Sequence, residues 1–145
     1  MNIPMKVDYG IRALVDIAYH QEHGPIRASE ISKRQNIPHN YLEQVLHSLG
    51  QKGITRSHRG PTGGHSLAID ASDISMGQIM QYLGGRPAPM NCLIDTSSCT
   101  QSPGCSQRNI WQEVEVAMLR VLDDTSIADL VKTTRRQNMI GFSRN

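Results

Sequence analysis

The sequence of 145 residues is poor in aromatic side chains and has no long apolar run. One Phe, one Trp and four Tyr are too few to build the stacking surface with which many proteins bind single-stranded nucleic acid. No apolar run approaches the roughly 18 residues of a membrane span. Residues 1–8 are not a basic segment followed by an apolar core, so we expect no secretory signal, a cytoplasmic location and no membrane partner.

Signatures of common enzyme classes are also missing. There is no G-x-S-x-G nucleophile motif, and residues 59–64 lack the Gly-Lys-Ser/Thr ending of a phosphate-binding loop. All six histidines, at positions 20, 23, 39, 47, 58 and 65, lie in the first half of the chain and away from the cysteines. We therefore expect neither an enzyme nor a small-molecule substrate.

Charge is nearly balanced, with 15 basic and 13 acidic residues, and its local distribution is more informative than the total. No acidic residue lies between Glu43 and Asp70, whereas Lys52, Arg56 and Arg59 all fall there. A local basic patch on a near-neutral chain indicates a surface that binds a polyanion.

Apolar periodicity predicts a mainly α fold with one small β-hairpin. Helices are expected at about 5–22, 29–35, 39–51, 75–83 and 108–124, with a short helix from Ser126 to Lys132 and strands at 54–58 and 66–69. Gly24-Pro25, Pro38 and Gly84-Gly85 supply the breaks. The expected organisation is a winged helix-turn-helix domain over 1–84, a cysteine-rich loop over 85–107, a dimerisation helix and short C-terminal helix over 108–134, and a flexible tail over 135–145.

The order helix, short helix, turn, helix and hairpin is that of a winged helix-turn-helix DNA-binding domain. The helix at 39–51 has an apolar stripe and an opposite polar stripe, as a helix needs when it packs on a core and enters a major groove. The expected partner is double-stranded DNA. The candidate contacts are Ser29, His39, Asn40, Tyr41, Glu43, Gln44, Arg56, Arg59, Gly60, Pro61, Gly63 and Gly64. The alternative is a winged helix used for protein contacts, whose polar side chains are only solvated.

The helix at 108–124 has a wide apolar face that needs a partner. Ile110, Trp111, Val114, Met118 and Val121 contribute to it. The partner is either the first helix of the same chain or the same helix of a second subunit, which would make a homodimer.

The three cysteines, Cys92, Cys99 and Cys105, lie in one segment without usable periodicity. Gaps of six and five residues do not match the CxxC pairs of zinc ribbons or thioredoxin-like motifs. Three cysteines in a chain without an export signal are a poor disulfide framework. Grouped thiolates suit a soft site that holds an iron–sulfur cluster, zinc or copper(I). The alternative is three unrelated reduced cysteines in a flexible loop.

These residues resemble the Rrf2 family of bacterial winged-helix regulators, typified by IscR, NsrR and RirA. The resemblance runs from Met5 to about Leu130 and is carried by residues 8–14, 37–44 and 59–64 and by the three-cysteine loop. It implies a homodimeric transcription factor that binds a palindromic operator, with Tyr41, Glu43 and Gln44 on the recognition helix and Arg59 on the wing. The three cysteines would hold a two-iron or four-iron cluster whose state sets DNA affinity, and the helix at 108–124 would be the dimer helix.

The fourth cluster ligand that the resemblance implies differs between branches of the family. IscR-like members place a His three residues after the last Cys, where this chain has Arg108, which cannot be a ligand while protonated. NsrR-like members use an Asp in the first helix of the other subunit, and Asp8 stands at the matching place. The first gap between cysteines is six residues rather than the commoner five. An acid in the first turn of a helix also interacts favourably with the helix dipole, so both roles of Asp8 stay open.

Three functional hypotheses follow from these observations. The first is a DNA-binding regulator tuned by an iron–sulfur cluster that senses iron, redox state or nitric oxide. The second keeps the fold but senses by cysteine oxidation or holds a structural zinc ion. The third is a small electron-transfer or cluster-carrier protein, which has no need of a wing or of a stretch without acidic residues.

Overall fold

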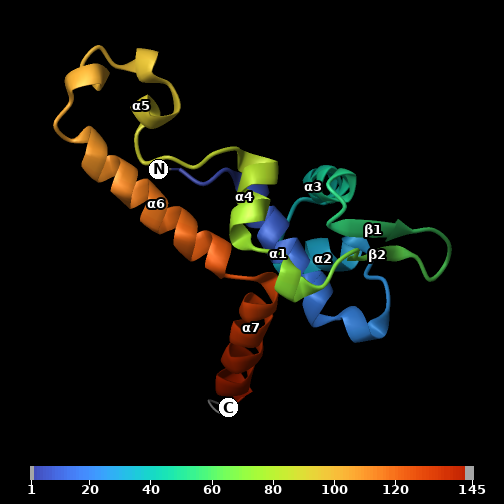
Figure 1. The fold of residues 1–145 in the computed structure, drawn as a ribbon. Coiled ribbons are helices and arrows are strands. Elements are labelled where there is room, and N and C mark those ends of the chain that lie inside the picture. Colours follow the sequence, from blue (N-terminus) through green and yellow to red (C-terminus); the bar gives the residue numbers. More distant parts are fainter. Residues whose placement is uncertain (1, 143–145) are drawn as a thin grey trace.

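The computed structural model describes residues 2–142, and one long helix extends from a body of packed helices (Figure 1). The body contains α1 (Met5–Tyr19), α2 (Ala28–Gln35), α3 (His39–Gln51), α4 (Met76–Gly84) and α7 (Ile127–Phe142), with a hairpin of β1 (Thr55–His58) and β2 (Gly64–Leu67). The extension is α6 (Arg108–Asp124), and the cysteine segment, residues 85–107, lies at its outer end with the short helix α5 (Asn91–Ile94). The predicted mainly α fold with a small hairpin wing is confirmed.

Short 3₁₀ turns connect several of these elements. They are η1 (Gln21–His23), η2 (Ala71–Asp73), η3 (Thr96–Ser98) and η4 (Ser102–Gly104).

No helix within the described residues is long and apolar enough to cross a membrane.

The first helix, α1, is the centre of the body, with α2, α3, α4 and α7 packed around it. Its apolar side chains enter two buried clusters, one shared with α3, α4 and α7 and the other with α2 and α3. Burial of each large aliphatic side chain in these clusters contributes about 1.5–3 kcal/mol. Gly10 allows α1 and α4 to approach closely, because a Cβ at this position would collide with Leu83. The helix-turn-helix unit is thus built directly on α1.

The N-terminal starts of α4 and α7 fix the inner end of α6 to the body. Ser75 and Gln78 form a capping box at the start of α4, and Ser126 and Asp129 exchange the same two kinds of hydrogen bond at the start of α7. The two starts lie side by side, because the Ile127 N–H donates to the Ile74 carbonyl at 2.8 Å. The inner end of α6 is therefore anchored beside α4, while its outer end carries the cysteines.

The C-terminal helix is longer than predicted. The predicted short helix ends near Lys132, whereas α7 continues along α1 to Phe142 and so includes part of the predicted tail. The Arg135 guanidinium lies 5.0 Å from the centre of the Tyr19 ring, and the Asn138 amide donates to the Tyr19 hydroxyl at 3.3 Å. These contacts stabilise a part of the helix whose own sequence has little apolar periodicity. The last three residues of the predicted tail lie outside the described residues.

Other predicted boundaries need smaller corrections. The helices at 39–51 and 108–124 are confirmed, but α1 ends at Tyr19 rather than near residue 22. The second strand runs over Gly64–Leu67 rather than 66–69, because its first residues, Gly64 and His65, pair with His58 and Ser57 of β1. The cysteine segment is not a structureless loop, since it contains α5 and two 3₁₀ turns.

Candidate nucleic-acid interface and cysteine segment

The helix α3 presents its polar side chains to solvent and its apolar side chains to the body. The apolar stripe is buried, whereas His39, Asn40, Tyr41, Glu43 and Gln44 are all exposed. The Tyr41 ring packs edge-on against Tyr9 of α1, and His39 Nε2 lies 3.5 Å from Glu43 Oε1. The first turns of α3 therefore offer amide, imidazole and carboxylate groups, which are groups that can read base edges in a major groove.

A tight turn joins α2 to α3. Asn36 ends α2 in the left-handed conformation with φ 52°, and Ser32 Oγ donates to the Ile37 carbonyl at 2.5 Å. No side chain caps the start of α2 or of α3, which leaves the first N–H groups of both helices without a side-chain acceptor. Ser29 is exposed in the first turn of α2. This geometry is that of the predicted helix-turn-helix.

A buried ion pair that the sequence analysis missed fixes α2 to α1. The Asp16 side chain is 1% exposed and accepts from Arg34 Nη2 at 2.7 Å, from Arg34 Nε at 3.0 Å and from Gln35 Nε2 at 3.0 Å. The hydrogen bonds to Asp16 raise the pKa of Arg34. The available signal was an acid on a helix face that also carries Ala13 and Ile17. The pair holds α2, and the turn after it, at one angle to α1.

The hairpin is antiparallel, with Thr55 opposite Leu67 and His58 opposite Gly64. Its second strand also pairs with the segment before α2, because Ile26 and His65 exchange backbone hydrogen bonds of 2.9 and 2.7 Å. A Cβ at Gly64 would lie 2.5 Å from the Ile26 carbonyl oxygen, so this close approach requires glycine. These bonds hold the hairpin against the helix-turn-helix unit.

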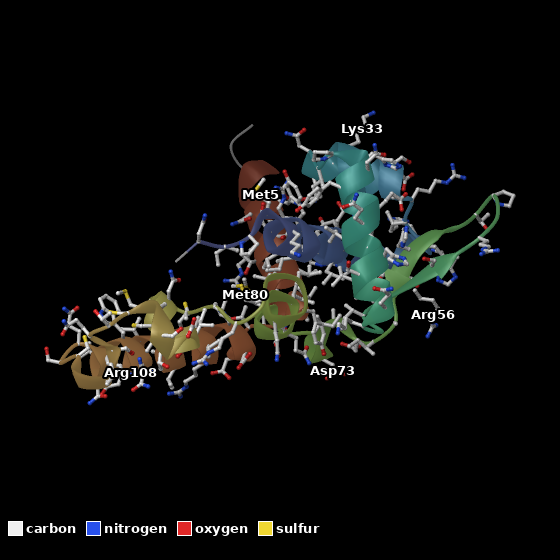
Figure 2. The ribbon with its side chains drawn as sticks, turned by 90° about the horizontal axis from the view of Figure 1, so that it is seen from above. Met5, Lys33, Arg56, Asp73, Met80 and Arg108 are labelled. Carbon is white, nitrogen blue, oxygen red and sulfur yellow. The ribbon has the colours of Figure 1, made fainter. Side chains whose placement is uncertain are left out.

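The hairpin carries the predicted basic contacts, with Arg56 in β1 and Arg59 at the turn. Arg56 and Arg59 are exposed, as are Gly60 and Pro61 at the turn, while Gly63 is buried. Figure 2 shows Arg56 projecting from the hairpin. The Arg27 guanidinium donates to the Pro61 carbonyl and ties the turn to the start of α2. Three further residues lie beside the predicted contacts but are not marked by any pattern in the sequence: Arg27, His58 and His65.

The three cysteines lie on three different turns of the cysteine segment. Cys92 is in α5, Cys99 follows η3 and Cys105 follows η4. All three are free thiols, and Cys99 is exposed. Within residues 2–142, no three His, Cys, Asp or Glu side chains converge as a metal-binding group. The three cysteines therefore share one segment of the chain, but their side chains do not converge on one site.

Two arginines hold this segment in place. Arg108 Nη1, at the start of α6, donates to the Cys92 carbonyl at 2.9 Å and to Ser102 Oγ at 2.7 Å. Arg86 Nε and Nη2 donate to the two carboxylate oxygens of Glu115 at 2.7 and 2.8 Å. Glu115 is buried in the middle of α6, and its hydrogen bonds raise the pKa of Arg86. Arg86 thus ties the start of the segment to the middle of α6, and Arg108 ties Cys92 and Ser102 to the start of α6.

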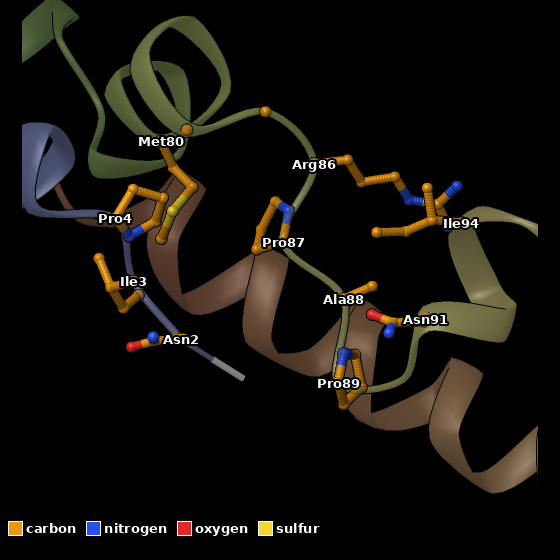
Figure 3. A pocket seen from close by; sticks show the side chains of 12 residues that line it. Asn2, Ile3, Pro4, Met80, Arg86, Pro87, Ala88, Pro89, Asn91 and Ile94 are labelled. Atoms are coloured by element: carbon orange, nitrogen blue, oxygen red, sulfur yellow. The ribbon is translucent and has the colours of Figure 1, made fainter.

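The start of the cysteine segment also borders a pocket. After Gly85, Arg86 and the following prolines run beside Ile3 and Pro4, with a cavity of about 330 Å³ between the two stretches (Figure 3). Asp8 lies further along the same N-terminal region, in the first turn of α1, and its carboxylate pairs with Arg12 at 3.1 Å.

The predicted dimerisation face of α6 lies uncovered along much of its length. Ile110, Val114 and Val121 are exposed, and Trp111 and Met118 are half-buried. Glu115 is the one buried residue of α6. The first of the two predicted partners, α1 of the same chain, does not cover these side chains, because α6 contacts mainly α4 and α5.

Comparison with known proteins identifies the family. The family model described as "Iron-dependent Transcriptional regulator" matches residues 3–133. The chain is 35% identical to Protein rrf2 of Nitratidesulfovibrio vulgaris over 132 residues, which cover 91% of this chain and 88% of that protein. Among solved structures, one similar chain is CymR, described as the global cysteine regulator of B. subtilis. It is 28% identical to this chain with a TM-score of 0.78, and the match covers 92% of this chain and 98% of the CymR chain.

A second solved structure supports the same assignment. T. potens IscR is 29% identical with a TM-score of 0.75, and the match covers 92% of this chain and 88% of that one. These relatives are regulators rather than enzymes, in agreement with the absence of enzyme motifs from the sequence. This chain belongs to the Rrf2 family of DNA-binding transcriptional regulators.

Proposed function

We propose that the protein is a homodimeric regulator that reads a palindromic operator with α3 and the hairpin, and that its cysteine segment is the sensor. The observation that carries the proposal is the fixed relation between the reading elements. The Asp16–Arg34 pair orients α2, and the Ile26–His65 bridge orients the hairpin. A helix with an exposed polar face and an arginine-bearing hairpin are thereby held as one rigid unit.

In this proposal, the residues divide into base-reading and phosphate-binding groups. Asn40 and Gln44 suit adenine, Glu43 suits the amino group of cytosine, and Arg59 enters the minor groove. Lys52 and Arg56 contact phosphates and contribute affinity rather than sequence preference. In the homodimer, α6 of each subunit packs on the other, which places two α3 helices on half-sites about one helical turn apart.

Arg59→Ala tests the role of the hairpin. We expect the variant to lose about 1–3 kcal/mol of specific binding to a symmetric operator selected from random DNA, measured by fluorescence anisotropy. The matched control is Arg136→Ala, because Arg136 is exposed on α7, outside α3, the hairpin and α6. Equal affinities of the Arg59 variant and the parent protein would contradict contact by the hairpin.

For the sensor, we propose that Cys92, Cys99 and Cys105 hold an iron–sulfur cluster, with Asp8 of the other subunit as the fourth ligand. Three thiols in one segment fit such a cluster by donor type, and the family description names iron dependence. Since the described part of the chain forms no three-residue ligand group, the segment must rearrange to bind it. When bound, the cluster would supply a centre that reacts with oxygen or nitric oxide. Unchanged cluster lifetime and DNA response in Asp8→Ala would remove Asp8 from the ligand set.

The chain's own contribution to sensing is the connection between the segment and α6. The Arg108 hydrogen bonds join the turns of Cys92 and Ser102, and the Arg86–Glu115 pair joins the segment to the middle of α6. A rearrangement of the cysteines would therefore change these contacts with α6, the helix that we assign to the dimer interface. That link would change the spacing of the two α3 helices and hence the DNA affinity.

A second candidate is sensing by cysteine oxidation or a structural zinc ion without a cluster. It is favoured by the three separate free thiols, one of them exposed. The absorption spectrum of protein purified without oxygen, with iron, zinc and acid-labile sulfide counted, separates the two. Broad visible bands with matched iron and sulfide support the cluster, whereas colourless protein that still binds the operator supports thiol or zinc chemistry.

A further inference from the structure

A hollow of about 310 Å³ lies between the start of α2, the start of α3 and the hairpin. Three imidazoles line it, and they come from three different elements: His39 from α3, His58 from β1 and His65 from β2. Arg27 and Ser29 line the side toward α2, and Glu43 is the one acidic residue in the lining. The hollow therefore combines Arg27, which is always cationic, with three histidines that become cationic when protonated, and all four side chains can donate hydrogen bonds.

The three histidines differ in how they are held. His58 Nε2 lies 2.7 Å from Ser66 Oγ, and His39 Nε2 lies 3.5 Å from Glu43 Oε1. His65 is fixed by its two backbone bonds to Ile26, but its Nδ1 atom is buried and has no hydrogen-bond partner. Because a proton on this buried nitrogen has no acceptor, the doubly protonated, cationic form of the ring is disfavoured in the free protein.

The place of the hollow indicates its ligand. The major and minor grooves of DNA are separated by a sugar–phosphate strand. If α3 occupies a major groove and the tip of the hairpin an adjacent minor groove, this strand must pass over whatever lies between them. The hollow lies between α3 and the hairpin, and its lining includes the Gly63 and Gly64 backbone, which packs closely against His58 and Ile26.

We propose that this hollow binds a backbone phosphate of DNA and that binding is accompanied by proton uptake at His65, so that DNA affinity rises as pH falls. The inference rests on the proposed function, because it requires operator DNA as the ligand. It adds Arg27, His58 and His65 to the DNA-contacting residues and gives the contact a dependence on pH.

The direction of the pH dependence follows from the groups around His65. Burial lowers the pKa of His65 below its ordinary value; the Glu43 carboxylate acts in the opposite direction, and His58 adds to the lowering. Arg27 and His39 also line the hollow beside His65. His65 is therefore neutral in the free protein near pH 7, and a phosphate anion beside it raises its pKa. Affinity grows as pH falls from the pKa of the bound state to that of the free state, by at most about tenfold per pH unit for one proton.

The test compares the parent protein, His65→Gln and the matched control His23→Gln, all as the full chain. His23 is an exposed histidine in η1 and does not line the hollow. Operator affinity is measured by fluorescence anisotropy from pH 8 to pH 6 at fixed ionic strength, with thermal melts to confirm folding. We expect the gain in affinity between these pH values to be about fivefold smaller in His65→Gln than in the parent, and unchanged in His23→Gln. Equal pH dependence in all three proteins would overturn the inference.

A second readout does not depend on a variant. The imidazole resonances of His65 are titrated by NMR in free protein, with operator DNA and with inorganic phosphate alone. A higher pKa with DNA, and little change with inorganic phosphate, supports a site for the DNA backbone. An equal rise with inorganic phosphate would overturn DNA as the specific ligand. Absence of operator binding at every pH would instead refute the proposed function itself, while pH-independent operator binding would refute only this inference.

Discussion

At the scale of single residues, the ion pair between Asp16 and Arg34 has a structural role, unlike the exposed charges for which we propose contact with DNA. Arg34→Ala leaves the buried Asp16 carboxylate with a hydrogen bond from the Gln35 side chain, and with His20 Nδ1 3.7 Å from Oδ1. We expect this substitution to lower the free energy of unfolding by about 3 kcal/mol, at the lower end for buried pairs because the Arg34 side chain is 36% exposed. Urea denaturation of the full chain measures the loss.

Arg12→Ala is the matched control for that substitution. Arg12 also pairs with an aspartate of α1, Asp8, but both side chains are substantially exposed. Exposed pairs of this kind contribute less than about 1 kcal/mol. A loss in Arg34→Ala no larger than that in Arg12→Ala would show that the Asp16 pair does not hold α2 in place.

At the scale of secondary-structure elements, the sequence predicts those that its own periodicity determines. The bounds of α3 and α6 are confirmed because each has a clear apolar stripe. The length of α7 could not be predicted, since the contacts of Arg135 and Asn138 with Tyr19 join residues more than a hundred positions apart. For the candidate site, the exposed face of α3 was predictable, whereas the pairing of β2 with Ile26 depends on tertiary structure.

The Arg86–Glu115 pair gives a prediction at the same scale, because it connects the cysteine segment to α6. In Glu115→Gln, the charge that holds Arg86 is lost while the shape of the side chain is kept. We expect backbone amides of residues 87–107 to exchange about tenfold faster with deuterated solvent, as local opening becomes easier. Arg120→Ala removes a surface pair of the same helix and should leave exchange in this segment unchanged. Unchanged exchange in Glu115→Gln would contradict the link.

At the scale of the whole molecule, the exposed face of α6 predicts the oligomeric state. Ile110 is 59% exposed and Val121 65% exposed, on the predicted dimerisation face. A charge buried in an apolar interface is strongly unfavourable, so we expect Val121→Glu to convert the dimer to monomer in sedimentation equilibrium. Ile69→Glu places the same charge on an exposed apolar residue outside α6 and should leave the mass unchanged. A dimer that persists in Val121→Glu would place the interface elsewhere.

The central claim is that the state of the cysteine segment sets the affinity of one dimer for one DNA site. The most direct measurement is the affinity for a selected operator of a single preparation purified without oxygen, before and after exposure to oxygen, with the absorption spectrum recorded on the same samples. The account predicts a symmetric site with half-sites about one helical turn apart, and an affinity that changes at least tenfold together with the spectrum. Sequence-specific binding that is identical before and after exposure, although the spectrum has changed, would contradict it.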